Sequence, residues 1–338
     1  MTTSEDHLFA GRQTLTLSMA EVKQLLSMSE GIELQRIAFE DHARGQAFNA
    51  PSTWLRVNKH SGWMKLLAGF VDRTDAMGMK VLARYPNNPP GQNLGSLLIL
   101  FDPANGFPLA IFDSVYITGV RTGAGGGLAT QYCARKDAKT VGILGSGVHA
   151  RFTMQAICEL VPDLDRALVY SRNQQRREAY CQRMEAATGL SFVPVDSSQA
   201  AVENTDIIVT ATNSPNPILK KEWIKPGAHI NAMGIKTEIF PDVFPGARVY
   251  GDSVEVATDD GKFSTAIKAG TVAKSDMNGE IGEVLLGQKP GRVNEEEITI
   301  FDSAGLAVQD VVCALHVYQQ ARERNMGRYV DFGLAEAP

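Results

Sequence analysis

The stretch KTVGILGSGVHARFTMQAI, residues 139–157, decides how the middle of this chain folds. Its strand-type run TVGIL leads directly into GSGVHA at 145–150, and a helical pattern follows. In such a turn the first glycine permits the tight bend, the second lets a pyrophosphate approach the backbone, and a small third residue lets helix and strand pack closely. The N–H groups and dipole of a helix start also favour phosphate. The stretch therefore predicts a dinucleotide site.

The chain beyond this turn alternates between strand-like and helix-like segments. Helical patterns cover 148–160 and 174–187, and the strand-like runs are ALVYS, SFVPV, DIIVTAT, AHINAMG, ARVYG and EITIFDS. Continuous apolar runs such as 207–209 are typical of strands covered on both faces. His229 lies in one of these runs, and we expect it to be packed. The alternation predicts a Rossmann-type, doubly wound parallel sheet over residues 118–305.

The residues before 118 follow a different pattern. Residues 19–44 carry apolar side chains at helical spacing, and short strand-like runs separated by turn formers come after them. Short strands joined by tight turns favour an antiparallel sheet, so we expect an α+β domain over 1–117. A long amphipathic helix near the C-terminus returns to this domain, which adds 306–338 to it. Asp310, near the start of that helix, either contacts the active site or favours the helix N-terminus.

Composition excludes several classes of protein. The chain has 338 residues, 44% of them hydrophobic and 21% charged, which is typical of a globular protein. The net charge of −5, with both signs mixed, predicts no binding to nucleic acid or to an anionic membrane. The polar N-terminus has no apolar signal segment, and the four cysteines lack zinc-ligand spacing. We expect a cytoplasmic protein with reduced thiols and no metal.

The end of the second strand in the alternating region predicts which dinucleotide binds. NAD sites usually carry an acid there for the ribose 2′-hydroxyl, whereas an arginine accommodates the 2′-phosphate of NADP. This chain reads YSRN at 170–173, without an acid. A guanidinium suits a phosphate through paired charge-assisted hydrogen bonds, so Arg172 favours NADP over NAD. In the alternative, Arg172 lies against adenine or in solvent, and Ser171 or Asn173 contacts the ribose.

Cationic side chains before the glycine turn indicate the charge of the substrate. Lys80 and Arg84 are four residues apart on an expected strand, so both point to one face. Arg121 lies in the segment YITGVRTGAGGGLAT, at the expected hinge beside the cofactor. Small residues after it suit close packing at a helix start. The cations favour an anionic substrate, and the alternative is a solvated edge of the sheet.

Several motifs together resemble the ornithine cyclodeaminase/mu-crystallin family. They are GMKV, LLILFDPANGFPLAIFDSVYITGVRTGA, VGILGSGVHA, GAHINAMG, GEIGEVLLGQKPGR and ITIFDSAGLAVQD, and the resemblance covers residues 22–320. This family includes cyclodeaminases, alanine dehydrogenase and reductases of imino acids, which use a nicotinamide cofactor to move hydride at an α-carbon that carries nitrogen. The resemblance implies a Rossmann domain and an N-terminal domain that dimerises through its sheet, so we expect a homodimer.

The resemblance also assigns roles to individual residues. Lys80 stands where the family has the lysine that contacts the substrate carboxylate, and Arg121 where it has an arginine that binds the same group. We expect these two in catalysis, with Arg56, Arg84 and Lys236 as further substrate-binding residues. The expected cofactor-binding residues are Thr122, Gly145, Ser146, Gly147, Val148, His149, Ala150, Ser171, Arg172, Asn173, Thr210, Ala211, Thr212, Met233, Gly234, Ser303 and Gly305.

Two departures from the family pattern bear on the reaction. Many members have another carboxylate-binding arginine whose equivalent here falls near Ser52, so Arg56 or Arg84 would have to replace it. The cyclodeaminases carry a catalytic aspartate in a segment like GGDCPGKTEL. Here the text is NAMGIKTEIFPD, where Lys236 or Glu238 occupies the region. Without that base, ring closure loses general acid–base help of about 10²–10⁴ in rate.

The sequence therefore favours reduction of an α-imino acid to the L-amino acid with NAD(P)H, which in reverse is an amino-acid dehydrogenase reaction. Lys236 would attract a second carboxylate, so a dicarboxylic imine such as iminosuccinate suits these cations together. Oxo acids with an amine, and cyclic imines such as pyrroline-2-carboxylate, stay open. The alternatives are an ammonia lyase of the ornithine cyclodeaminase type and a non-catalytic binding protein of the mu-crystallin type.

Overall fold

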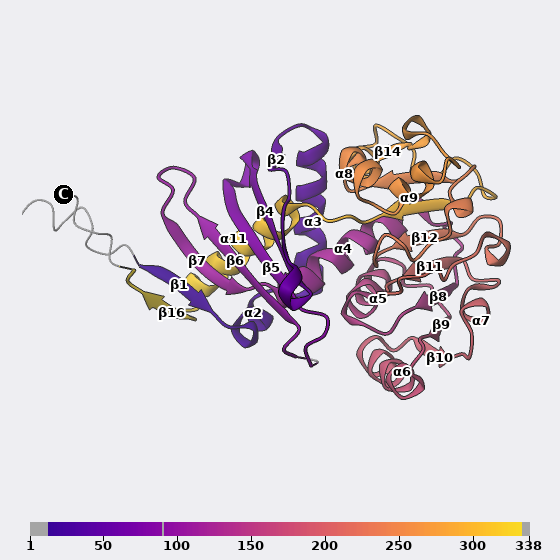
Figure 1. Ribbon diagram of the computed structural model, residues 1–338, viewed down its shortest axis with the longest axis horizontal. Helices are drawn as coiled ribbons and strands as arrows, with labels where there is room; N and C mark the ends of the chain where they lie inside the picture. Colours follow the sequence, from indigo (N-terminus) through magenta and orange to yellow (C-terminus); the bar gives the residue numbers. More distant parts are fainter. Residues whose placement is uncertain (1–12, 90, 333–338) are drawn as a thin grey trace, which may run out of the picture. The chain divides into compact units, whose positions relative to one another are not determined.

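The computed structural model describes residues 13–89 and 91–332, which group into two compact units (Figure 1). Unit 1 contains the described residues up to Ser27, Gln46–Thr118 and the described residues from Ala307 onwards, and unit 2 contains Met28–Gly45 and Gly119–Leu306. The expected boundaries were 1–117 with 306–338, and 118–305. The main difference is the segment 28–45, which groups with unit 2.

Helix α3 (Met28–Ala43) accounts for this difference. A Cβ on Gly31 would clash with Val120 of α4 (Val115–Cys133), so the two helices are in direct contact. The ring of Phe39 packs edge-on against Phe301, with 6.3 Å between the ring centroids. Residues 19–44 therefore form two helices, α2 (Met19–Leu25) and α3, where the spacing alone predicts one continuous pattern.

Unit 1 is built on an eight-stranded sheet in the order β16-β1-β7-β6-β5-β4-β2, with β3 paired to β4. The strands are β1 (Thr14–Leu17), β2 (Ala47–Asn49), β3 (Thr53–Val57), β4 (Gly62–Val71), β5 (Ala76–Arg84), β6 (Leu94–Phe101), β7 (Pro108–Asp113) and β16 (Arg328–Val330). Neighbouring strands are antiparallel except for β1 and β7, which are parallel. The expected antiparallel sheet is therefore present, and α4 begins at Val115, directly after it.

Helix α11 (Ala307–Glu323) covers one face of this sheet (Figure 1). Two glycines make room for it, because a Cβ on Gly69 would lie 3.0 Å from Ala307 and one on Gly78 would lie 3.1 Å from Val311. The opposite face carries apolar side chains on β2 to β7. Its exposed residues include Phe48, Leu55 and Leu97, each about half exposed.

Unit 2 contains a sheet of eight parallel strands in the order β10-β9-β8-β11-β12-β15-β13-β14. The strands are β8 (Thr140–Leu144), β9 (Arg166–Tyr170), β10 (Ser191–Pro194), β11 (Ile207–Thr210), β12 (His229–Ala232), β13 (Arg248–Gly251), β14 (Gly279–Glu280) and β15 (Thr299–Asp302). From β8 the chain moves to β9 and β10, and then returns to β11 on the other side of β8. The strand order therefore reverses between β8 and β11, which confirms the predicted doubly wound sheet.

Helices connect the strands of unit 2. They are α4, α5 (Val148–Leu160), α6 (Gln174–Thr188), α7 (Ser198–Val202), α8 (Val254–Asp259), α9 (Phe263–Lys268) and α10 (Ile281–Leu285). Short 3₁₀ turns complete the chain: η1 (Asn58–His60), η2 (Asp72–Thr74), η3 (Lys221–Trp223), η4 (Pro241–Val243) and η5 (Lys274–Asp276). None of the helices in the described part of the chain has the length and apolar character needed to span a bilayer.

The glycines after Arg121 lie inside α4, where the sequence predicted a helix start. A Cβ on Gly123 would clash with the backbone of Phe152, and one on Gly127 would lie 2.6 Å from the Cβ of Ala156. Both neighbours belong to α5, so the glycine run lets α4 lie directly against the helix that follows the 145–150 turn.

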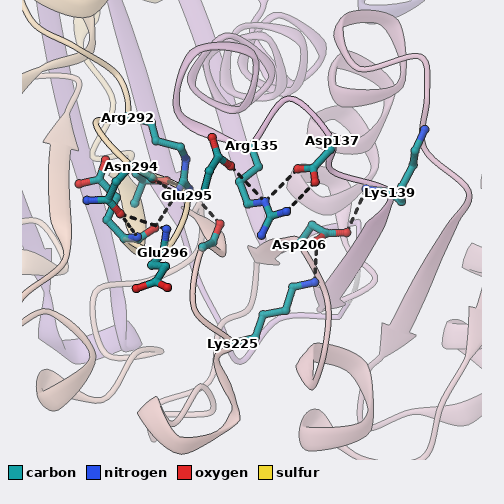
Figure 2. A network of polar contacts seen from close by, with 12 residues as sticks. Arg135, Asp137, Lys139, Asp206, Lys225, Arg292, Asn294, Glu295 and Glu296 are labelled. Atoms are coloured by element: carbon teal, nitrogen blue, oxygen red, sulfur yellow. Dashed lines mark hydrogen bonds and ion pairs between the residues drawn. The ribbon is translucent and has the colours of Figure 1, made fainter.

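The amino ends of the parallel strands are joined by polar contacts (Figure 2). Asp206, just before β11, accepts hydrogen bonds from the backbone N–H groups of Lys139 and Thr140, both at 2.9 Å, and from Lys225 Nζ at 2.6 Å. Although burial opposes ionisation, these donors lower the pKa of Asp206 to about 2. Contacts within the protein therefore occupy the amino edge of the sheet, and the carboxyl edge is the one available to a ligand.

His229 of β12 is fully buried, as predicted, with Nδ1 2.9 Å from Thr299 Oγ1. Burial and the nearby Arg292 guanidinium lower its pKa to about 3. The unfolded chain, with a histidine pKa of about 6.5, therefore binds a proton in a pH range where the folded chain does not. As a result, His229 lowers the stability as the pH falls from about 6.5 towards 3.

We predict that His229→Gln loses less stability on acidification than the wild type. Between neutral pH and pH 5 the wild type should lose about 2 kcal/mol more, because the unfolded imidazole gains a proton that the buried one cannot accept. Urea unfolding at the two pH values measures the difference. Equal losses in the two proteins would show that His229 is protonated in the folded state.

Candidate active site

A pocket of about 560 Å³ opens at the carboxyl ends of β8 and β11, where the strand order reverses. In doubly wound sheets this is the position where ligands bind. The pocket brings together eight of the seventeen predicted cofactor-binding residues. These are Gly145, Ser146, Gly147, Ser171, Arg172, Asn173, Ala211 and Thr212.

The glycine turn has the backbone geometry that a pyrophosphate requires. Gly145 adopts φ of +119°, and a Cβ on it would clash with the carbonyl oxygen of Ala211. At Gly147, the N-cap of α5, no atom lies within 4 Å of the Cβ position, so the backbone is open to a ligand. Ala150 is fully buried between helix and sheet. These residues fit a dinucleotide, because its phosphates can approach the first N–H groups of α5.

The segment after β9 and the first turn of α6 present two arginines to this pocket. Arg172 and Arg176 are exposed and line it, and within 13–89 and 91–332 neither guanidinium makes a hydrogen bond or ion pair. Arg177 is buried instead, where it donates to the carbonyl oxygen of Ser171 at 3.0 Å and to Asp196 at 2.8 Å. Arg177 therefore holds the β9 loop in place, while Arg172 and Arg176 can bind an anion.

Arg121 is buried on α4 beside the turn that follows β15. A Cβ on Gly305, which adopts φ of +86°, would lie 3.0 Å from Arg121 Nη1. The buried Asp252 accepts hydrogen bonds from the N–H groups of Ala304 and Gly305, and Lys262 donates to the carbonyl oxygen of Ser303. Ser303 and Gly305, which we expect to bind the cofactor, therefore lie in a turn that is next to Arg121 within unit 2.

The segment after β12 carries the two residues that occupy the place of the cyclodeaminase aspartate. Lys236 pairs with Asp260 at 2.6 Å, and both side chains are about half exposed. Glu238 is fully buried, and its carboxylate accepts four hydrogen bonds from Thr210, Thr212 and Gly234. Burial raises its pKa, although Lys262 and these donors oppose the rise.

The other expected cofactor residues lie near Glu238, near Arg121 and at the start of α5. Thr210 and Met233 are buried near Glu238, and Thr122 is buried on α4 next to Arg121. Val148 and His149 form the first residues of α5. No group of three or more His, Cys, Asp or Glu side chains in the described residues could hold a metal ion, and the four cysteines are free thiols.

Lys80, in unit 1, forms a buried ion pair that the sequence did not reveal. Its Nζ lies 2.6 Å from Asp310 Oδ2, and the two side chains are 2% and 0% exposed. Asp310 thus contacts a predicted catalytic residue. The β-sheet register places Arg56 and Arg84 on opposite sides of Trp63, on the same face as Lys80. The expected cations of unit 1 therefore share one face.

Comparison with known proteins confirms the resemblance stated above. Residues 12–325 match the model of the ornithine cyclodeaminase/mu-crystallin family. The chain belongs to this family. Its solved relatives include a Δ¹-pyrroline-2-carboxylate reductase from Thermococcus litoralis in complex with NADH and L-proline, which is 33% identical with a TM-score of 0.90 and is matched over 94% of this chain and 100% of its own.

Two further solved relatives were determined with a bound nicotinamide dinucleotide. An archaeal alanine dehydrogenase dimer with bound NAD is 34% identical, with a TM-score of 0.89 over 95% of this chain and 100% of its own. The iminosuccinate reductase of Paracoccus denitrificans in complex with NAD⁺ is 28% identical, with a TM-score of 0.87 over 95% of this chain and 100% of its own. This chain is similar to all three across nearly its whole length.

We predict that Asp310→Asn destabilises the protein by about 3–5 kcal/mol, because it removes the carboxylate from a buried ammonium. The double variant Lys80→Met with Asp310→Leu should recover most of that loss, since two apolar side chains need no counter-charge. Chemical denaturation measures both. A single variant as stable as the wild type would show that the ion pair is not coupled in the folded protein.

Proposed function

We propose that this protein reduces an α-imino acid to the L-amino acid with a nicotinamide dinucleotide, and that it catalyses the reverse reaction as an amino-acid dehydrogenase. The observation that most supports this is the glycine turn at Gly145, packed against Ala211 at the reversal of strand order, in a chain of this family. The relatives solved with NADH or NAD are named as a pyrroline-2-carboxylate reductase, an alanine dehydrogenase and an iminosuccinate reductase, which supports the reaction class.

A bound NAD(P)H would supply the hydride. The open backbone at Gly147 and the first turn of α5 would bind its pyrophosphate, and residues 211–214 would line the path towards the nicotinamide. Arg172 and Arg176 would bind the 2′-phosphate of NADP through charge-assisted hydrogen bonds. The proposal therefore keeps the lean towards NADP, while the relatives named above were solved with NAD or NADH.

We assign the α-carboxylate of the substrate to Arg121 and Lys80. A buried guanidinium can bind a carboxylate through two parallel hydrogen bonds, which fixes the orientation of Cα. We also assign the proton that the imine nitrogen needs to Lys80 or to a water held by a polar neighbour, and the ion pair with Asp310 fixes the position of Lys80 Nζ. Orientation and protonation are the main contributions that a protein makes to hydride transfer.

The segment after β12 supports a reductase over an ammonia lyase. A lyase of the cyclodeaminase type needs a base near the distal amine. Glu238 is buried with all its acceptor positions occupied, and Lys236 is a cation paired with Asp260. A dicarboxylic imine such as iminosuccinate remains our preferred substrate, because Lys236 would attract its second carboxylate, and Arg56 and Arg84 are further substrate-binding cations.

We also propose a homodimer formed through the apolar face of the unit 1 sheet. This face carries Phe48, Leu55 and Leu97, each about half exposed in the single chain. Contiguous apolar surface on a sheet marks an interaction site. The archaeal relative described as an alanine dehydrogenase dimer supports this assembly.

We predict that the wild type oxidises NAD(P)H with iminosuccinate, formed from oxaloacetate and ammonium, and that Arg121→Ala and Lys80→Ala each lower kcat/KM by at least about 100-fold through lost orientation of the substrate. Lys274→Ala, the matched control, should stay close to wild type, because its exposed ion pair with Asp259 contributes little. Pyrroline-2-carboxylate and pyruvate with ammonium complete the panel. Failure to reduce any imine, or proline formed from ornithine with catalytic NAD, would overturn the proposed reaction.

We predict a preference for NADPH that depends on the two pocket arginines. Arg172→Ala should lower the ratio of kcat/KM for NADPH over NADH by about 10–100-fold, because charge-assisted hydrogen bonds to the 2′-phosphate are lost. Arg183→Ala, a control on helix α6 outside the pocket, should leave the ratio unchanged. If the wild type shows no preference for NADPH, the assignment of Arg172 is wrong.

A further inference from the structure

The burial of Glu238 is explained neither by the proposed catalysis nor by a contact with the cofactor. Its carboxylate is 0% exposed. Oε1 accepts from Thr210 Oγ1 at 2.7 Å and from the Gly234 N–H at 2.8 Å, and Oε2 accepts from the Thr212 N–H at 2.9 Å and Thr212 Oγ1 at 3.0 Å. Burial of an acid is costly unless such donors surround it.

These donors come from two neighbouring strand ends. Thr210 is the last residue of β11 and Thr212 follows it, while Gly234 lies just beyond β12. The two strands pair in register up to Thr210 and Ala232. Beyond that point the Glu238 carboxylate joins the loops that follow β11 and β12, and a Cβ on Gly234 would clash with its Oε2. Glu238 therefore sets the separation of the two loops.

One of the two loops is a wall of the dinucleotide pocket. Ala211 and Thr212 line the pocket, and the carbonyl oxygen of Ala211 fills the space next to Gly145. A Cβ on Gly145 would also lie 3.2 Å from Thr212 Cγ2. Any shift of Thr212 away from Glu238 therefore changes the space between this wall and the glycine turn.

We propose that Glu238 is a positioning residue for the dinucleotide, which acts by fixing Thr212 and Gly234 through its carboxylate. The inference rests on the proposed function, because it takes the pocket at Gly145 as the cofactor site. Glu238 does not line the pocket, so its effect on binding passes through Thr212.

The donor geometry makes a carboxyl group necessary. Each oxygen receives one fixed backbone N–H and one threonine hydroxyl, and a hydroxyl can rotate whereas an N–H cannot. The amide of a glutamine would turn its NH₂ group towards the N–H of either Thr212 or Gly234. Glu238→Gln, although similar in shape, therefore leaves a buried donor without an acceptor.

The test measures the Kd for NADPH and NADH by fluorescence titration, without any imine present. Glu238→Gln should raise the Kd by about tenfold or more, while kcat at saturating cofactor and the KM for the imine change far less. Thr210→Val removes only the hydroxyl donor to Oε1, from a buried side chain outside the pocket, and should raise the Kd by a smaller factor. This second variant keeps the test decisive if Glu238→Gln fails to fold.

The matched control is Asp206→Asn. Asp206 also accepts backbone N–H groups at strand ends, but at the amino edge of the same sheet, outside the pocket. It should lower the melting temperature and leave the Kd unchanged. A Kd equal to that of the wild type in folded Glu238→Gln and Thr210→Val overturns the inference alone. A wild type that binds neither nucleotide overturns the proposed function and this inference with it.

Discussion

The contact between the backbone of Gly145 and the carbonyl oxygen of Ala211 is the constraint on which the candidate site depends. Gly145 adopts a left-handed conformation, and any side chain there would occupy the space of that carbonyl. The contact joins the ends of β8 and β11 at the reversal of strand order. Because Gly147 stays open beside it, the same few residues close the sheet and expose the first N–H groups of α5.

Buried and exposed charges have different tasks at the two edges of the parallel sheet. At the amino edge, Asp206 binds the strands to one another (Figure 2). At the carboxyl edge, Glu238 accepts hydrogen bonds from the N–H groups of loops beside the pocket. Asp252 accepts them from the loop beside Arg121. These acids are therefore buried, while the side chains that line the pocket after β9 include two cations, Arg172 and Arg176.

Local patterns were sufficient to predict the parallel sheet, the glycine turn and the helix at 148–160, because each depends on a short run of residues. Contacts between distant residues were not predictable in the same way. Lys80 and Asp310 are 230 residues apart, and 28–45 joins unit 2 only through the packing of α3. Glu238 stands in a turn-rich segment where an acid is usually solvated, so its four donors become apparent only in the folded chain.

The central claim is that this protein transfers hydride from a nicotinamide cofactor to the α-carbon of an imino acid. The most direct test uses NAD(P)H labelled with deuterium at C4, in both stereochemical forms, with iminosuccinate and pyrroline-2-carboxylate as acceptors. Mass spectrometry of the amino acid then locates the label. We predict deuterium at Cα from one of the two labelled forms. An amino acid without the label from either form, or oxidation of the cofactor without any amino acid product, would contradict the account.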